Sequence, residues 1–251
     1  MKKPNVAIAG LTACFGCQLT LLDCENELAA MADRFTFAYF PMGVTTRTIE
    51  GDFDAAFVEG AVSTPEDLEM LVHLRSRSRL LIALGTCARW GGIAGLKNNE
   101  PRLPLAETVY GGDAHHIDTF NPGPLHRFVS VDAAIVGCPP EKPDIIATLA
   151  ALLAGTLPVF TAYPVCMECR ERENLCLLIE RNKLCLGPLI QSGCGARCPA
   201  AGMVCEGCRG PAAETNSVAQ ETLLREKGFT RDEIASRMRR FSWEWDHDQD
   251  H

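Results

Sequence analysis

The stretch NVAIAGLTACFGCQLTLLD, residues 5–23, passes from a short apolar run through a loop with two cysteines into a leucine-rich segment. The run at 5–9 has the length and composition of a strand buried on both faces. Apolar side chains then recur with a helical period, which predicts a helix over 18–33. A strand that leads directly into a helix is the repeating unit of a parallel α/β sheet.

The rest of the first 160 residues repeats this alternation. Further strands are predicted at 35–40, 54–62, 79–84 and 131–136. A helix is predicted over 65–77, with Thr64 as its N-cap and Pro65 in its first turn. Another is predicted over 143–154, ended by Gly155. The pattern predicts an α/β fold with an open parallel sheet over residues 1–160.

Composition excludes some classes of partner. The 24 basic and 32 acidic side chains give a net charge of -8, which argues against nucleic acid because phosphate binding needs a surplus of Lys and Arg. The first ten residues contain no secretory leader, and the longest apolar run, at 145–155, is much shorter than the roughly 20 residues needed to cross a bilayer. We expect a soluble, cytoplasmic protein with no membrane span.

Thirteen cysteines dominate the chemistry of the chain. The cytosol keeps thiols reduced, so metal binding is expected before disulfides. Cys14, Cys17, Cys87 and Cys138 each follow a predicted strand. Ligands of open parallel sheets bind outside the carboxyl ends of the strands, so these thiols are expected to converge as a four-thiolate cage beside several glycines. Any one of them alone would be a packed thiol.

The other cysteine-rich segment, 161–215, is rich in Gly and Pro and too poor in apolar side chains for a core of its own. Eight cysteines lie in the 43 residues from 166 to 208. They divide by spacing into Cys166, Cys169, Cys176 and Cys185, and into Cys194, Cys198, Cys205 and Cys208. Iron–sulfur clusters are favoured over zinc, because the second four contain only one C-x2-C pair and no histidine lies between residues 127 and 245.

Four motifs carry a family resemblance. CFGCQLTLLD, VEGAV, GTCARWGG and VGCPP, in this order, resemble the N-terminal domain of nickel–iron hydrogenase small subunits. The resemblance implies a flavodoxin-like fold and a proximal 4Fe-4S cluster held by Cys14, Cys17, Cys87 and Cys138. The iron–sulfur subunit of complex I also resembles this half, but it typically carries two adjacent cysteines at the first motif and a single cluster.

The resemblance continues into the small, irregular second domain. It is similar to the two-cluster tail of cytoplasmic hydrogenase small subunits, such as those of deazaflavin-non-reducing hydrogenases and sulfhydrogenases. This implies a distal 4Fe-4S cluster on Cys166, Cys169, Cys176 and Cys185, and a medial one on Cys194, Cys198, Cys205 and Cys208. Periplasmic relatives commonly carry a histidine where Cys166 stands and a proline near Cys198. Ligation by cysteine alone implies a low-potential relay.

The implied function is that of an oxidoreductase subunit. The chain would relay electrons through three 4Fe-4S clusters between the nickel–iron centre of a separate large subunit and a further redox subunit of the flavin, NAD(P) or heterodisulfide reductase type. Hydrogen would be activated on the large subunit, so this chain has no catalytic residue of its own. A complex I-like subunit and a zinc-stapled interaction module are the alternatives.

Some neighbouring residues keep two interpretations. Glu59 ends a strand beside the first cysteines, either as a contact to a partner or as a capped carboxylate. Arg89 and Trp90 follow Cys87 and either shield the first cluster or pack elsewhere. Cys24 is left over when twelve ligands are assigned, and we expect it to be a packed thiol.

Residues 216–251 are predicted to form a helical C-terminal tail. Asn216 starts one helix, Gly228 ends it, and TRDE at 230–233 is a capping box for a second. The apolar residues near the end of the chain suggest a strip for docking. They are Met238, Phe241, Trp243 and Trp245.

Overall fold

The computed structural model describes residues 3–45, 49–160 and 163–242. The chain divides into two compact units, Met1–Pro158 and Val159–His251. The finer division of the second unit into a cysteine-rich domain and a separate tail stays a prediction.

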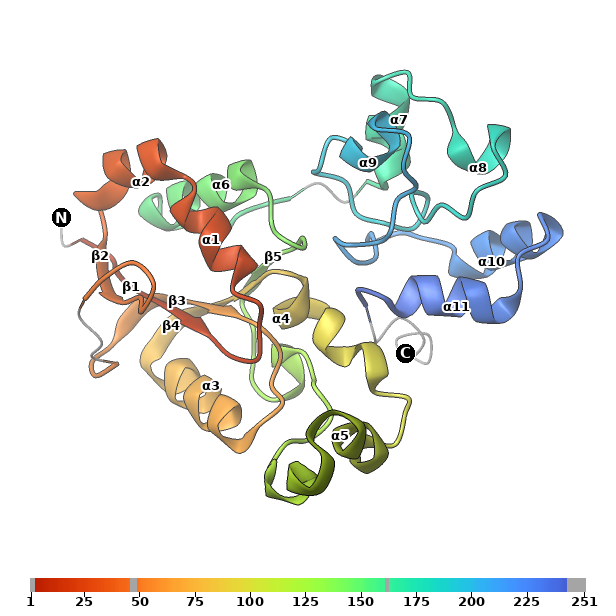
Figure 1. Cartoon of the computed structure of the whole chain (residues 1–251). Helices are drawn as coiled ribbons and strands as arrows, with labels where there is room; N and C mark the ends of the chain where they lie inside the picture. The colour runs from red at the N-terminus through yellow and green to blue at the C-terminus, as the bar shows by residue number, and fades with distance from the viewer. Residues whose placement is uncertain (1–2, 46–48, 161–162, 243–251) are drawn as a thin grey trace. The chain divides into compact units, whose positions relative to one another are not determined.

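The first unit is built on one sheet. Its strands are β1 (Asn5–Gly10), β2 (Thr36–Tyr39), β3 (Phe53–Glu59), β4 (Ser78–Leu84) and β5 (Ala133–Ile135). They lie in the order β2-β1-β3-β4-β5, and every neighbouring pair is parallel (Figure 1). This is the strand order of flavodoxin-like folds, so the predicted fold class is confirmed.

Helices cover both faces of this sheet. They are α1 (Gly16–Leu22), α2 (Glu25–Ala32), α3 (Pro65–Arg77), α4 (Thr86–Trp90), α5 (Arg102–Tyr110) and α6 (Lys142–Leu153), with short 3-10 turns at Ile93–Lys97, Gly111–His116 and Leu125–Arg127. Figure 1 shows α1, α2 and α6 on one face and α3 on the other. Leu71 and Leu74 of α3 share a fully buried core with Ala7, Ala56 and Ala83 of the central strands.

The helix predicted over 18–33 is wrong as a single element, because the chain turns between α1 and α2. Lys142 holds this turn from α6: its Nζ donates to the backbone oxygen of Asp23 at 2.7 Å and lies 3.0 Å from the Asp23 carboxylate. Glu25 and Glu27 then stand in the first turn of α2, where negative charge favours a new helix start.

The start of α3 is fixed by a network around one carboxylate. Thr64 and Asp67 form the predicted cap as a full capping box, in which each side chain bonds to the backbone N–H of the other. The same Asp67 Oδ2 also accepts from Thr12 Oγ1 at 2.7 Å and from Ser63 N at 3.0 Å. Because Thr12 lies in the loop after β1, this carboxylate connects that loop to α3.

The described part of the second unit, residues 159–160 and 163–242, contains five short helices and a small core. The helices are α7 (Val165–Glu171), α8 (Leu177–Glu180), α9 (Arg197–Ala200), α10 (Ser217–Glu226) and α11 (Arg231–Arg239). Leu186 and Ile190, from the cysteine-rich segment, are buried together with Leu224 of α10 and Ile234 of α11. The sequence predicts too few apolar side chains for a core in the cysteine-rich segment. That expectation is corrected in part, because the segment's own Val165, Leu184 and Leu189 are buried in this core and α10 and α11 supply the rest.

Both C-terminal helices begin where the sequence predicts. Asn216 Oδ1 accepts from Ala219 N at 2.8 Å. Thr230 and Glu233 form a complete capping box. These local signals need no tertiary context, which is why the sequence alone locates them.

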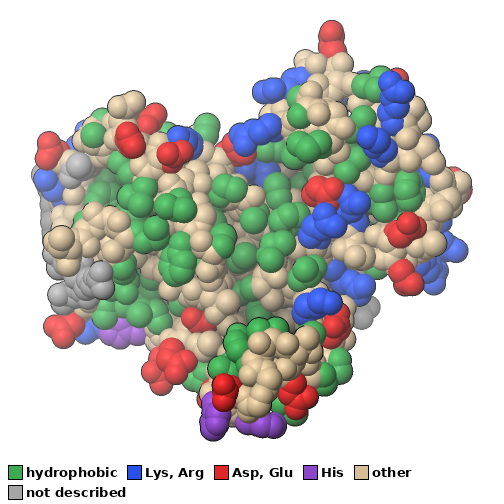
Figure 2. All heavy atoms as spheres, viewed as in Figure 1, with side chains coloured by type: hydrophobic (Ala, Val, Ile, Leu, Met, Phe, Trp, Pro, Cys, Tyr) green, Lys and Arg blue, Asp and Glu red, His purple; other side chains and the backbone are tan. Residues whose placement is uncertain are grey.

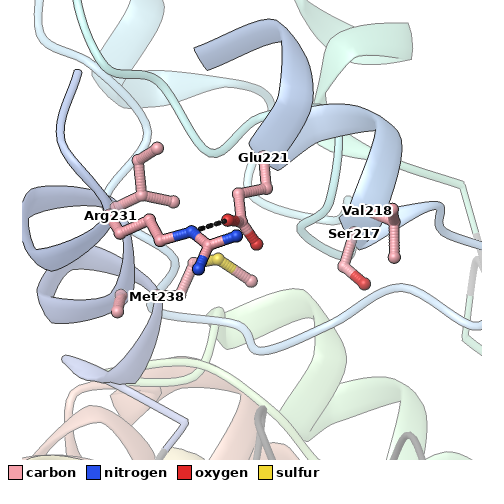
Figure 3. A pocket seen from close by; sticks show the side chains of 7 residues that line it. Ser217, Val218, Glu221, Arg231 and Met238 are labelled. Atoms are coloured by element: carbon pink, nitrogen blue, oxygen red, sulfur yellow. Dashed lines mark ion pairs between the residues drawn. The ribbon is translucent and has the colours of Figure 1, made fainter. Parts of the chain in front are cut away.

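The predicted apolar docking strip is not supported by its described members. Met238 is buried in the core and Phe241 is partly buried, whereas Trp243 and Trp245 lie outside the described residues. Figure 3 shows a pocket between α10 and α11, across which Arg231 forms an ion pair with Glu221. We assign no function to this pocket.

We expect Asp67→Ala to lower the free energy of unfolding of the first unit by about 1–2 kcal/mol, because the α3 cap loses its acceptor. Pulse proteolysis in urea measures this change. The exposed Glu69→Ala, two residues further along α3, is the control and is expected to behave as wild type. Equal midpoints for the two variants would contradict the role of this network.

Candidate functional sites

The first group of cysteines, which we name the first tetrad, lies at the carboxyl edge of the sheet. It comprises Cys14, Cys17, Cys87 and Cys138, which follow β1, β4 and β5. In this strand order the direction of the connections reverses between β1 and β3, which is where flavodoxin-like folds bind ligands. Cys17 is buried in α1, whereas Cys14 is exposed.

A side chain that sequence reasoning missed joins two of these loops. Thr86 N donates to the backbone oxygen of Gly137 at 3.1 Å, and Gly137 N donates back to Thr86 Oγ1 at 3.0 Å. This reciprocal pair connects the residue before Cys87 to the residue before Cys138. The only signal in the sequence is the small polar residue beside a cysteine, which is too common to be diagnostic.

Glu59 is the cap of α1. Its side chain is 1% exposed, and its two carboxylate oxygens accept from Cys17 N and Gln18 N, each at 3.1 Å. These N–H groups belong to the first turn of the helix and have no partner within it. Of the two interpretations of Glu59, the structure supports the capped carboxylate.

Two glycines pack directly against sulfur atoms of the first tetrad. A Cβ atom at Gly85 would lie 2.3 Å from Cys17 Sγ, and one at Gly92 would lie 2.6 Å from Cys87 Sγ. Both glycines also have positive φ angles, 87° and 50°. Any side chain here would therefore displace a thiol, and only glycine fits.

Burial and mutual proximity disfavour ionisation of these thiols. Burial raises the pKa of Cys17, the Glu59 carboxylate raises it further, and the Cys87 and Cys138 thiols add smaller contributions. Burial likewise raises the pKa of Cys87, and Cys14 adds to the effect. The structure thus brings all four predicted residues into one electrostatic neighbourhood.

The second tetrad, Cys166, Cys169, Cys176 and Cys185, also converges. The first two lie in α7, Cys176 immediately precedes α8, and Cys185 is buried in the following loop. Burial raises the pKa of Cys166 to about 12, with further contributions from the other three thiols. These contributions place the four residues close to one another.

The third tetrad, Cys194, Cys198, Cys205 and Cys208, lies beside the second. Burial raises the pKa of Cys205, and the Cys185, Cys208 and Cys194 thiols add to it. Cys205 N also donates to the sulfur of Cys185 at 3.3 Å. The two tetrads therefore meet at Cys185 and Cys205, and the assignment of each cysteine to one tetrad stays a prediction, as does the place of Cys198.

Two charged residues that sequence reasoning missed lie around Cys194. Glu168 Oε1 accepts from Gly193 N at 2.8 Å, and its Oε2 accepts from Ala196 N at 3.1 Å and lies 3.9 Å from Cys194 Sγ. Arg209 is only 2% exposed. From the sequence alone, a charged residue next to a cysteine is expected to be exposed to solvent. The sequence does not reveal that these two side chains are partly or fully withdrawn from it.

Backbone donors complete the environment expected of a cluster. The N–H groups of Ile93 and Ala94 bond to Cys87 and lower its pKa, opposing burial. Those of Gly187 and Cys205 do the same for Cys185. N–H donors aimed at thiolate sulfur are among the means by which proteins adjust iron–sulfur clusters. The chain's residues therefore fit such a group.

The arrangement of the cysteines bears on whether they could hold a single metal ion or a cluster of several. All thirteen cysteines are free thiols. Within residues 3–45, 49–160 and 163–242, no three His, Cys, Asp or Glu side chains converge closely enough to hold a single metal ion. Four thiolates around one zinc, each about 2.3 Å from it, must touch one another, whereas a cluster lets each thiolate bind a separate iron.

The remaining residues singled out in the sequence lie outside the tetrads. Cys24 is buried and its thiol donates to the backbone oxygen of Thr20 at 3.3 Å, as expected of a packed thiol. The Arg89 guanidinium stacks over the Trp90 ring, 3.8 Å from its centroid. No helix among the described residues has both the length and the apolar character of a membrane span.

Comparisons with known proteins agree with this architecture. The family profile described as NADH ubiquinone oxidoreductase, 20 Kd subunit, matches residues 14–152. Sulfhydrogenase 2 subunit delta of Pyrococcus furiosus is 39% identical, over 95% of this chain and 99% of that protein. One subunit of the vhu F420-non-reducing hydrogenase of Methanocaldococcus jannaschii is 32% identical, over 82% and 81%. A chain in the crystal structure of an NAD+-reducing NiFe hydrogenase is 32% identical with a TM-score of 0.59, over 64% and 96%.

The fold and the matched segment define the class: the chain belongs to the family of the NADH ubiquinone oxidoreductase 20 Kd subunit. Within it, the relatives that span both units are hydrogenase subunits, and the predicted identification as a nickel–iron hydrogenase small subunit is confirmed. The complex I-like alternative rested on the first half of the chain, and the family profile matches residues 14–152.

We expect Glu59→Gln to loosen the start of α1. The amide keeps one acceptor oxygen but turns an N–H₂ group toward the second backbone donor, which leaves a buried N–H unsatisfied at a cost of about 1–3 kcal/mol. Hydrogen exchange of the peptide spanning 14–22 is expected to accelerate. The exposed Glu107→Gln is the control, and unchanged exchange in Glu59→Gln would contradict the capping role.

Proposed function

We propose that the chain is the electron-transfer subunit of a cytoplasmic nickel–iron hydrogenase and holds three 4Fe-4S clusters. The single observation that carries this proposal is the mutual proximity of the cysteines, with four thiols together at the sheet edge and the thiols of the second unit around Cys185 and Cys205. The first tetrad is proposed as the proximal site, the second as the distal site and the third as the medial site.

Metal ligation resolves an energetic conflict in these tetrads. Burial raises the pKa values of Cys17, Cys166 and Cys205, so without metal these thiols stay protonated at neutral pH. Iron binds the thiolate and displaces the proton, so loading would replace buried neutral thiols by metal-bound thiolates. Among the described residues no three such side chains are arranged to hold a single ion, which supports a cluster over the zinc alternative.

Exposure supports the proposed order of the clusters. The first and second tetrads each have one exposed cysteine, Cys14 and Cys176, whereas the third has none. Exposed apolar side chains accompany both, with Leu19 54% exposed in α1 and Ile179 60% exposed in α8. An accessible tetrad is suited to exchange electrons with a partner subunit. A tetrad without an exposed cysteine is suited to the middle step of the relay.

The proposed partners follow from these two surfaces. A large subunit carrying the nickel–iron centre would contact the first tetrad, and a further redox subunit of the flavin, NAD(P) or heterodisulfide reductase type would contact the second. Figure 2 shows Lys and Arg side chains gathered over the second unit. The exposed Arg170, Arg172 and Arg181 around the second tetrad alternate with exposed glutamates at 171, 173 and 180, so this surface offers a partner both signs of charge.

The chain supports electron transfer without a catalytic residue of its own. When bound, a 4Fe-4S cluster accepts and releases one electron at a time. The cysteines hold it, the backbone N–H groups bond to thiolate sulfur, and the buried apolar residues exclude water. A chain that uses twelve cysteines as metal ligands suits a reducing compartment such as the cytoplasm.

Metal and sulfide analysis of anaerobically purified protein tests the proposal. We expect about twelve iron atoms and twelve acid-labile sulfides per chain, together with a nickel-containing large subunit in an affinity pull-down. About four of each would indicate a complex I-like subunit. Zinc in place of iron would contradict the proposal.

We expect Gly85→Ala to remove the first cluster selectively. The new Cβ would lie 2.3 Å from Cys17 Sγ, so the tetrad cannot close, and about four iron atoms are lost while about eight remain. Gly112→Ala is the matched control, because no atom lies within 4 Å of the place its methyl group would take and the backbone there is ordinary. Full iron content in Gly85→Ala would refute the assignment of the first tetrad.

A further inference from the structure

Arg209 is a buried cation next to a proposed cluster ligand. It directly follows Cys208, and its side chain is 2% exposed. Its guanidinium packs against the backbone of Gly193, where a Cβ atom would lie 2.4 Å from Arg209 Nη2. A guanidinium stays charged at every relevant pH, so this charge is held inside the second unit at a desolvation cost.

A carboxylate approaches the same loop. Glu168 accepts from the N–H groups of Gly193 and Ala196, and its Oε2 lies 3.9 Å from Cys194 Sγ. The loop that carries Cys194 is therefore in contact with one buried cation and one carboxylate. The two charges have opposite effects on negative charge that develops at the third tetrad.

The local electrostatics agree with this arrangement. Burial raises the pKa of Cys194 and Glu168 raises it further, whereas the N–H of Ala196 and the Arg209 guanidinium lower it. A charge in a water-excluded site acts more strongly than one at the surface, because solvent screens it less.

We propose that Arg209 stabilises the reduced form of the cluster held by the third tetrad and so raises its reduction potential, while Glu168 opposes it. This inference rests on the proposed function. Reduction adds one negative charge to a site that already holds four thiolates, and a buried cation favours the more negative state. Arg209 would act only through its charge on the potential of this cluster, and it would not contact hydrogen or the nickel–iron centre.

Redox titration of the whole complex, followed by electron paramagnetic resonance, tests the inference. Arg209→Met keeps the apolar stem and removes the charge, and is expected to make one of three midpoint potentials more negative. Glu168→Gln is expected to make the same potential less negative. Because Glu168 stands between Cys166 and Cys169, the second tetrad's potential is expected to rise as well.

Arg197→Gln is the matched control. Arg197 directly precedes Cys198, as Arg209 directly follows Cys208, but its side chain is exposed. Solvent screens an exposed charge, so we expect all three potentials of this variant to equal those of wild type. Arg209→Lys keeps a cation in place and is expected to retain most of the wild-type potential.

Each outcome separates this inference from the proposed function. Wild-type protein without iron would overturn the proposed function. A fully loaded Arg209→Met with unchanged potentials would overturn the inference alone, as would an equal shift in Arg197→Gln. If Arg209→Met does not assemble, Glu168→Gln tests the inference instead. An unchanged midpoint potential of the third tetrad in Glu168→Gln would show that charge beside this loop does not set that potential.

Discussion

Groups of buried cysteine thiols are the feature around which both units of the chain are organised. Burial raises the pKa in all three tetrads, so the apolar surroundings that exclude water also oppose the thiolate form. Backbone N–H groups bond to Cys87 and Cys185 and partly offset this cost. The glycines follow from the same constraint, because backbone reaches a buried sulfur only where no side chain intervenes.

Both units use a carboxylate to fix the backbone that carries their cysteines. Glu59 receives the N–H groups of Cys17 and Gln18, and Glu168 receives those of Gly193 and Ala196. In each unit the carboxylate comes from a different segment than the loop it binds. A carboxylate has two oxygens and can accept hydrogen bonds from two nearby backbone N–H groups, which fixes the conformation of an irregular loop.

Local signals in the sequence predicted much of the fold. The cap of α3 at Thr64 and the starts of α10 and α11 depend on residues within one helical turn. The break between α1 and α2 was missed because it depends on Lys142, which is distant in the sequence. The clamp by Glu168 and the burial of Arg209 escaped prediction for the same reason. The cysteine groups could be predicted because the number of residues between the cysteines is visible in the sequence.

The hydrogen bond from Cys205 to the sulfur of Cys185 has an evolutionary and practical corollary. It joins the last residue of the second tetrad to the backbone of the third residue of the third tetrad, so a shift of either loop would alter the other. Chimaeras between related chains should therefore be cut at the junction near residue 159, with the entire remainder transplanted as one cassette. Within that transplanted segment, insertions and deletions in loops are expected only where they preserve the hydrogen bond from Cys205 N to Cys185 Sγ.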